Sequence, residues 1–284
     1  MSYKTIMVLM NDLAQTRQLL DAASAIARQQ QAHLIGLYVL PAAKIYSDVG
    51  MLATPIVFEG YRDLFKSNCK AVQSNFETRM KQEGISFEWR SIDSLYPDIA
   101  ESAILSGHTA DLIISSQIGG DSEASVERDL VERLILESGR PVLIIPRTGR
   151  FAPRGEGISE KAIVGANGTK ESARAMFDAL PLLRAVKETR VVWVDPYTQP
   201  GDAGEVPGAE EAATLSRHNI KTIAEPMMTN GRNAGEALLM RANDLGADLL
   251  VMGAYGHSRM REFVFGGATR YVLEHATIPV MMSH

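Results

Sequence analysis

The sequence predicts an α/β protein built from two tandem, doubly wound parallel-sheet domains. Short apolar runs alternate with amphipathic segments of helical length along the chain. The runs are apolar almost throughout, which is typical of parallel strands covered by helices on both faces. Three segments also recur in the same order in both halves, with residues 6–11, 110–115 and 140–145 matching residues 162–167, 247–252 and 278–282.

The repeat has a period near half of the chain, which is too long for a solenoid and indicates a duplicated domain. We expect residues 1–147 and residues 161–284 to form the two domains. Residues 148–160 are rich in Gly, Pro and Arg, so we expect them to form the linker.

In the first half, the elements follow from apolar periodicity and from breaks at Pro and Gly. Leu19, Ala23 and Ile26 have helical spacing, whereas Pro41 and Gly50 mark an irregular connection over residues 41–58. The predicted strands are 5–10, 33–40, 87–90, 112–115 and 141–145. The predicted helices are 14–30, 59–83, 97–107 and 129–137.

The second half repeats this plan, with a Pro- and Gly-containing loop over residues 195–208 and a shortened helix after it. The predicted strands are 161–166, 190–194, 220–225, 248–252 and 279–282. The predicted helices are 170–186, 209–217, 232–245 and 267–275. Right-handed crossovers between parallel strands would place ligands beyond the carboxyl ends of the strands.

Composition excludes several classes of protein. The 284 residues carry a formal net charge of −5, so no overall basic field indicates binding to nucleic acid or to an acidic membrane surface. No apolar run approaches the roughly 20 residues of a membrane-spanning helix, and the first residues lack the layout of a signal peptide. Cys69 is the single cysteine, which excludes an intrachain disulfide framework and a thiolate metal cluster. We therefore expect a cytoplasmic protein.

The strongest candidate for a ligand site follows the strand at 248–252. Glycines are spaced there as Gly253-x2-Gly256-x9-Gly266, and Gly267 and Thr269 begin the next helix. Glycine lets the backbone approach a phosphate closely, and the N–H groups of a helix N-terminus attract anions. Arg259 within this loop suits a polyanion, although a solvated loop charge explains it equally well. The spacing alone is also compatible with a plain turn.

The equivalent loop of the first half lacks most of the glycines that would let a phosphate approach the backbone. Ser116 aligns with Gly253 and Gly119 with Gly256, whereas Arg128 and Asp129 stand where the second half has Gly266 and Gly267. Acidic residues in that loop would also repel phosphate, namely Asp121, Glu123 and Glu127. If either half binds a nucleotide, the sequence favours the second.

Two polar residues near the loop have competing interpretations. Asn167 ends the strand at 161–166 and either contacts an adenine edge or caps the helix at 170, with capping favoured. His257 has no carboxylate or nucleophile placed to partner it, so a loop residue is favoured over a catalytic one. Hydrolase and Walker A motifs are absent from the sequence, which argues against an ordinary hydrolase.

On these residues, the chain resembles the universal stress protein family in its tandem form over nearly all of its length. The resemblance implies a Rossmann-like, adenine nucleotide alpha hydrolase-like fold that binds ATP, with or without Mg²⁺. It implies contacts to phosphate and ribose from the loop glycines, a hydroxyl contact from Thr269 and an adenine pocket lined by Val194. The full candidate set is Asn167, Val194, Gly253, Gly256, His257, Arg259, Gly266, Gly267, Ala268 and Thr269.

Two positions depart from the family pattern. Gly267 replaces the usual Ser or Thr, and Asn167 replaces an aspartate that usually meets the adenine side. The resemblance further implies that the last strands of the two halves, around 142–145 and 280–282, pair antiparallel as an intramolecular pseudo-dimer, which would cover both strand edges. Association of two chains into a homodimer is left open.

The leading functional hypothesis is a stress-response protein with a regulatory rather than metabolic role, which binds ATP in its second half and hydrolyses it slowly at most. The alternative is a nucleotide-independent regulatory or interaction scaffold of the same fold.

Overall fold

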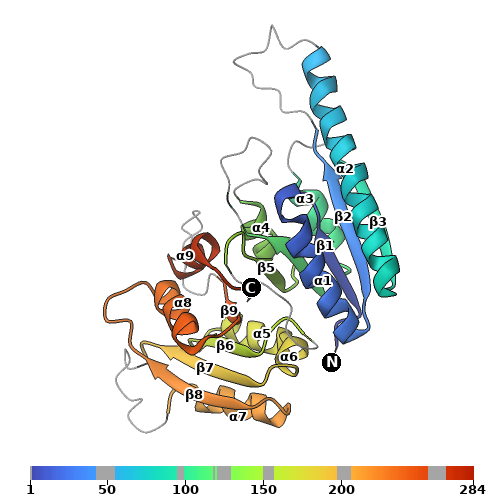
Figure 1. Cartoon of the computed structure of the whole chain (residues 1–284). Coiled ribbons are helices and arrows are strands. Elements are labelled where there is room, and N and C mark those ends of the chain that lie inside the picture. Colours follow the sequence, from blue (N-terminus) through green and yellow to red (C-terminus); the bar gives the residue numbers. More distant parts are fainter. Residues whose placement is uncertain are drawn as a thin grey trace.

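Ten strands form one mixed sheet in a computed structural model of the chain (Figure 1). The structure describes residues 2–42, 55–94, 99–117, 119, 129–149, 157–196, 206–254 and 267–284, with side chains within 55–83 described from residue 63. The strand order is β3-β2-β1-β4-β5-β10-β9-β6-β7-β8, so each half contributes five neighbouring strands.

The first half supplies β1–β5, which pair in parallel, and its described residues also form a 3₁₀ turn and four helices. Its strands are β1 (Thr5–Leu9), β2 (His33–Leu40), β3 (Phe87–Asp93), β4 (Leu112–Ser116) and β5 (Val142–Ile145). Its helices are η1 (Leu13–Gln15), α1 (Thr16–Gln30), α2 (Pro55–Glu83), α3 (Ala100–Gly107) and α4 (Leu130–Glu137). The long helix α2 extends beyond the strands that it covers (Figure 1).

The second half repeats the parallel arrangement with β6–β10. Its strands are β6 (Lys161–Ala166), β7 (Glu188–Val194), β8 (Thr222–Met227), β9 (Leu249–Gly253) and β10 (Val280–Ser283). Its helices are α5 (Lys170–Asp178), α6 (Leu180–Leu183), α7 (Ala209–Arg217), α8 (Ala234–Leu245) and α9 (Gly267–His275). The predicted doubly wound α/β fold is confirmed in both halves.

The Ala-Asp pair of the repeated strand motif has a structural role. Asp111 Oδ2 accepts hydrogen bonds from the backbone N–H groups of Lys4 and Thr5, at 2.7 and 2.9 Å. In the second half, Asp248 Oδ1 accepts from the N–H groups of Glu160 and Lys161, both at 2.9 Å. Each aspartate therefore ties the start of the central strand of its half to the neighbouring strand, which explains why the pair recurs.

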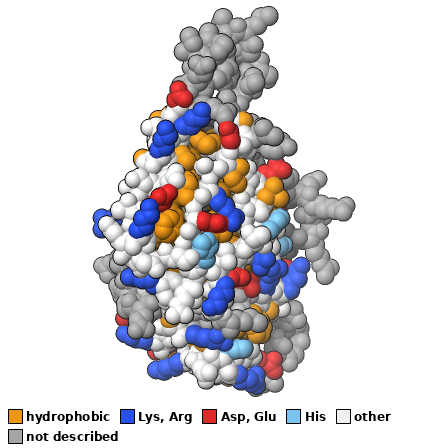
Figure 2. Space-filling view, turned by 90° about the vertical axis from the view of Figure 1, so that its right-hand side faces the viewer, with side chains coloured by type: hydrophobic (Ala, Val, Ile, Leu, Met, Phe, Trp, Pro, Cys, Tyr) orange, Lys and Arg blue, Asp and Glu red, His pale blue; other side chains and the backbone are white. Residues whose placement is uncertain are grey.

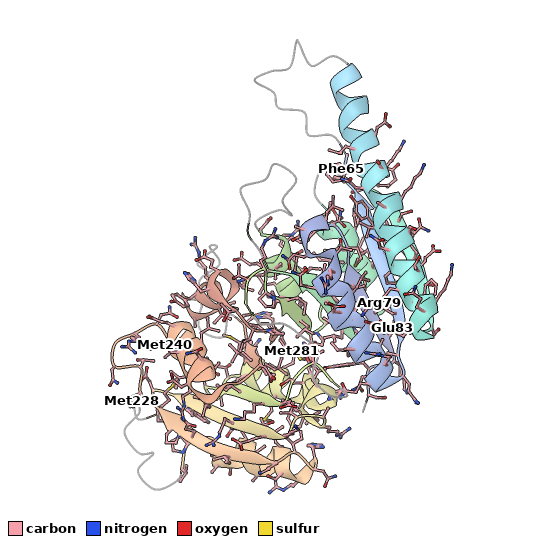
Figure 3. All side chains as sticks on the ribbon, in the orientation of Figure 1. Phe65, Arg79, Glu83, Met228, Met240 and Met281 are labelled. Atoms are coloured by element: carbon pink, nitrogen blue, oxygen red, sulfur yellow. The ribbon has the colours of Figure 1, made fainter. Side chains whose placement is uncertain are left out.

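The two halves meet at an antiparallel pairing of β5 with β10, as expected for a pseudo-dimer. Leu143 lies opposite Met281, with Val142 and Ile144 opposite Met282 and Val280. Met281 is fully buried and lies at the centre of the molecule in Figure 3, whereas Met228 and Met240 lie at its outer margin. The pairing covers the edge that each five-stranded unit would otherwise expose.

Side chains of alternate residues feed two core layers, one on each face of the sheet. In β1, Val8 belongs to the layer covered by α1, α2, α5, α6 and α7, and Met7 to the layer covered by α3, α4, α8 and α9. Because strand side chains alternate between faces, one apolar run serves both layers. The shared layers make the two halves one packed body.

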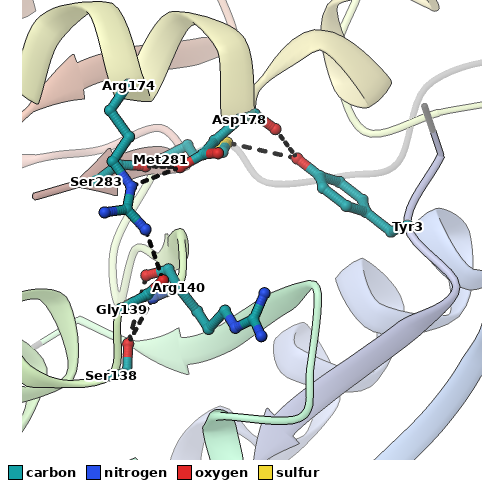
Figure 4. Close-up of polar contacts among 8 residues, drawn as sticks. All are labelled: Tyr3, Ser138, Gly139, Arg140, Arg174, Asp178, Met281 and Ser283. Atoms are coloured by element: carbon teal, nitrogen blue, oxygen red, sulfur yellow. Dashed lines mark hydrogen bonds and ion pairs between the residues drawn. The ribbon is translucent and has the colours of Figure 1, made fainter.

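Polar contacts reinforce the junction (Figure 4). Tyr3 Oη donates to the backbone oxygen of Asp178 at 2.6 Å, and Arg174 Nη2 donates to the backbone oxygen of Gly139 at 2.7 Å. Ser283 Oγ donates to Asp178 Oδ2 at 2.9 Å, so Asp178 joins β10 to the first residues of the chain. The two contacts of Asp178 connect residues more than 100 positions apart in the sequence, and the Arg174–Gly139 contact joins the two halves.

One predicted element is divided in the structure. The helix expected over 170–186 is broken into α5 and α6 around Ala179. Pro181 has no N–H group, and its ring would clash with the carbonyl of Phe177 one turn earlier, so an uninterrupted helix is disfavoured. The proline instead occupies the first turn of α6, where no N–H is required.

The surface agrees with the mixed charge of the sequence. On the face in Figure 2, basic and acidic side chains of the described residues are interspersed with apolar ones, and neither sign dominates. Within the described ranges, no helix combines the length and apolar character needed to cross a membrane.

Candidate functional site

Three of the predicted site residues lie at one edge of the second half. Asn167 follows β6, Val194 ends β7 and Gly253 ends β9, and these strands are neighbours in the order β9-β6-β7. Because the three strands are parallel, their carboxyl ends meet at this edge. Gly267, Ala268 and Thr269 form the first turn of α9. Gly256, His257, Arg259 and Gly266 lie outside the described residues.

The loop after β6 is built around the start of α5. Thr169 is the N-cap residue, and its Oγ1 accepts from the N–H of Ser172 at 3.3 Å. Asn167 Oδ1 accepts from the N–H and the hydroxyl of Thr169, at 3.2 and 2.9 Å. The prediction that Asn167 caps this helix is therefore wrong by two residues, because Asn167 supports the cap instead of forming it. Its Nδ2 group takes no part in this turn.

The equivalent asparagine of the first half makes different contacts. Asn11 is buried, with 8% exposure, and its Nδ2 donates to the backbone oxygen of Val39 at 2.7 Å. Its Oδ1 accepts from the N–H of Val39 at 3.0 Å. Asn11 therefore occupies both backbone groups at the end of β2, whereas Asn167 is exposed at the end of β6. The equivalent asparagines of the two halves therefore differ, because the amide is buried in the first half and exposed in the second.

An ion pair further fills the strand edge of the first half. Arg147 pairs with Asp12, whose side chain is 7% exposed, and the N–H of Arg147 donates to Gln117 Oε1 at 3.0 Å. A Cβ atom on Gly119 would lie 3.4 Å from Arg147 Cδ. The aliphatic part of Arg147 thus packs against the residue that aligns with Gly256. Sequence comparison missed Asp12, Gln117 and Arg147, because their partners lie far away along the chain.

Gly253 is required by packing within the protein. A Cβ atom at this position would lie 2.5 Å from both the carbonyl carbon of Glu171 and the nitrogen of Ser172. The backbone in the first turn of α5 therefore packs directly against the end of β9. The sequence predicts a tight turn at this glycine, and the family resemblance implies a phosphate or ribose contact. The structure adds a packing reason for glycine at this position.

Glu171 places a negative charge in the same turn. Burial favours the neutral form, but hydrogen bonds from its own backbone N–H, Thr169 and Lys170 outweigh this effect and lower the pKa of the carboxyl group. Lys170 Nζ lies 3.4 Å from Glu171 Oε1 and offsets the charge.

The start of α9 packs closely on the start of α8. A Cβ atom on Gly235 would lie 2.4 Å from the backbone oxygen of Ala268. Gly267 is exposed, Ala268 is half-buried, and Thr269 has 3% exposure. Thr269 is therefore largely covered by surrounding atoms.

Sequence reasoning missed Asn233, the N-cap residue of α8, which lies beside Gly267. The pattern that could have identified it is an asparagine directly before an amphipathic helix. For metals, the described residues contain no group of three His, Cys, Asp or Glu side chains that could hold an ion.

Comparisons with known proteins relate the second half to one family. The model of the universal stress protein family matches residues 159–284. A curated relative, the universal stress protein Slr1230 of Synechocystis, is 29% identical over 157 residues. That alignment covers 53% of this chain and 49% of the relative, so the chain matches about half of the relative's length.

Solved structures extend the likeness to the whole chain at the level of the fold. A universal stress protein from Archaeoglobus fulgidus superposes with a TM-score of 0.71 at 15% identity, covering 98% of this chain and 95% of its own. A functionally unknown protein from Pseudomonas aeruginosa gives a TM-score of 0.64 at 18% identity, covering 99% and 92%. Both chains have the length of two halves.

Proposed function

The chain belongs to the universal stress protein family, and we propose that its second half binds an adenine nucleotide, with ATP as the expected ligand. The binding would serve a stress response by regulation rather than metabolism. We further propose that residues 1–147 and 161–284 are the two domains, joined by residues 148–160. In the first domain, side chains would fill the equivalent strand edge, so that only the second domain binds the nucleotide.

The observation that carries this proposal is the contrast between Asn167 and Asn11. An amide can pair with the edge of adenine, which offers both donors and acceptors. Asn167 is exposed and its Nδ2 is not engaged in the loop, which supports such a contact. The side-chain amide of Asn11 is instead hydrogen-bonded to the backbone of Val39, which argues against a nucleotide in the first half.

The phosphate end would lie between β9 and α9. The N-terminus of α9 favours anions through its N–H groups and helix dipole. Gly256 and Gly266 would allow close approach, His257 and Arg259 would line the loop, and Val194 would face the adenine side. Gly253 would shape the turn through its packing on α5 and would not contact phosphate itself. Mg²⁺, where present, would be held mainly by the phosphates.

We expect hydrolysis to be slow at most, because the sequence contains no hydrolase or Walker A motif. The burial of Thr269 and the packing of Gly253 favour the alternative, a scaffold that functions without a nucleotide. This alternative predicts a protein that takes up no ATP.

Calorimetric titration of the purified chain with ATP separates the two functions. We expect saturable binding with one site per chain, abolished by Gly266→Leu because the new side chain would occupy the phosphate approach. The matched change Arg128→Leu in the first half should leave binding intact. Absence of saturable binding at millimolar ATP would refute nucleotide binding and leave the scaffold.

A further inference from the structure

Asn233 holds its side chain in a defined orientation at the start of α8. Its Oδ1 accepts from the N–H of Gly235 at 2.8 Å, and its backbone oxygen accepts from the N–H of Ala237 at 3.0 Å. Only the oxygen of the amide can accept the bond from Gly235. The cap therefore directs the Nδ2 group, with its two hydrogens, to the opposite side.

The opposite side is the first residue of α9. A Cβ atom built on Gly267 would lie 3.0 Å from Asn233 Nδ2, which is closer than ordinary contact. Glycine at position 267 thus leaves the space that the amide occupies. The close packing of Gly235 on the Ala268 carbonyl holds the two helix starts together.

Asn233 offers a side-chain donor close to the first residue of α9. Gly267 and Ala268 have no polar side chain, and Thr269 is buried at 3% exposure. Asn233 is half-buried, so its amide is fixed by the cap and still reachable from outside. Asn233 also lies beside the first residue of α9, and the N–H groups at a helix N-terminus favour an anion.

We infer that Asn233 binds a phosphate group of the nucleotide through Nδ2 and supplies the donor that position 267 lacks. The inference rests on the proposed function, since it names a further contact in the same site.

Asn233→Asp tests the contact without removing the cap, because Asp and Asn are similarly effective N-cap residues. The change replaces the donor with a carboxylate oxygen beside the phosphate. We expect ATP to bind at least about tenfold more weakly, since a hydrogen bond to a charged group is lost and repulsion is added. The matched control is Asn243→Asp, which adds the same charge near the other end of α8 and should bind ATP like the wild type.

A rescue separates a lost contact from a damaged helix. Asn233→Ala should weaken binding, and adding Gly267→Ser should restore most of it, because the serine supplies a hydroxyl in the space that the amide vacated. Gly267→Ser alone should not improve binding, because the new Cβ would crowd Asn233.

The outcomes are distinguishable by ATP titration and thermal melting of each variant. A wild type that binds ATP together with an Asn233→Asp variant that binds equally well would overturn the inference and leave the proposed function standing. Weak binding with a lowered melting temperature and no rescue by Gly267→Ser would assign the loss to the helix, and would also overturn it. A wild type that binds no ATP refutes the proposed function itself.

Discussion

At the scale of single residues, Asn11 and Asn167 end equivalent strands but hold different partners. Asn11→Ala removes two buried hydrogen bonds and leaves the N–H and C=O of Val39 unpaired, so the free energy of unfolding should fall by about 1–3 kcal/mol. Asn167→Ala removes exposed contacts that support a cap and should cost less than about 1 kcal/mol.

Urea unfolding measures both effects, and ATP titration of the same variants provides the functional readout. Only Asn167→Ala should weaken ATP binding. Equal losses of affinity in the two variants would contradict the assignment of the site to the second half.

Glu132 predicts a pH dependence of stability. Burial raises the pKa of its carboxyl group from 4.5 to about 7; Arg270 lowers it, and Asp129 and Glu274 raise it further. Between these two pH values the folded protein holds a proton that the unfolded chain releases, so stability falls as pH rises through this window. Above the window the cost of the ionised, buried carboxylate is fully present.

Glu132→Gln should remove this dependence. Its free energy of unfolding should match the wild type near pH 4.5 and exceed it by about 1–2 kcal/mol at about pH 8. Glu137→Gln on the same helix, where the carboxylate is 49% exposed, is the matched control and should show no such crossover. Denaturant titrations across this pH range provide the measurement, and parallel curves for wild type and Glu132→Gln would contradict the prediction.

The residue roles that could not be predicted from the sequence depend mostly on contacts between residues that are distant along the chain. The sequence located the loop after β6 but could not assign the cap to Thr169, because Asn and Thr are both good N-cap residues. It could not relate Gly253 to the turn at Glu171, some 80 residues earlier in the chain. Local spacing gives the position of a glycine, whereas the neighbour that requires it is set by the tertiary fold.

At the scale of elements, α8 and α9 form a close pair whose geometry depends on Gly235. In Gly235→Ala the new Cβ would lie 2.4 Å from the Ala268 carbonyl, so backbone must shift, at a cost of about 1–3 kcal/mol. The gain in helix propensity of about 1 kcal/mol offsets only part of this cost. Since α9 opens the proposed phosphate site, ATP binding should weaken as well.

Gly107→Ala at the end of α3 provides the matched control. Its Cβ would meet Ile113 Cδ1 at 2.5 Å, which is the end of a side chain that can rotate away. Thermal and urea unfolding should therefore show the larger loss for Gly235→Ala, and ATP binding should fall only there. A larger loss for Gly107→Ala would mean that the α8–α9 contact adapts easily.

Element types and most boundaries could be predicted, because buried strands and amphipathic helices leave clear periodic patterns. The bounds of β6, α7 and α9 agree with those expected from the sequence. The division of α5 from α6 was missed because the apolar pattern continues through Pro181, although the proline signalled a break. The start predicted for α3 at residue 97 lies outside the described residues.

At the scale of the whole molecule, duplication explains the architecture but not the difference between the halves. The repeat predicts two equivalent sheets, and the family resemblance predicts that their last strands pair, as β5 and β10 do. Side chains specific to each half then complete or open the strand edges. The ion pair between Asp12 and Arg147 fills the strand edge of the first half, and it is not part of any repeated motif.

The continuous sheet predicts that both halves unfold together. Each half contains one of the two tryptophans, Trp89 in β3 and Trp193 in β7, so the variants Trp193→Phe and Trp89→Phe report the first and second half separately by fluorescence. We expect coincident urea transitions in these two proteins, because both core layers and the contacts of Tyr3 and Arg174 cross the junction.

Met281→Glu should uncouple the unfolding of the two halves. The side chain lies fully buried opposite Leu143, so an unpaired carboxylate there would break the β5–β10 pairing before either half unfolds. In this background the two fluorescence transitions should separate along the urea axis. Met240→Glu, at a side chain 43% exposed, is the matched control and should keep them coincident. Separate transitions already present without the Met281 change would mean that the halves fold independently and that the shared sheet adds little to their stability.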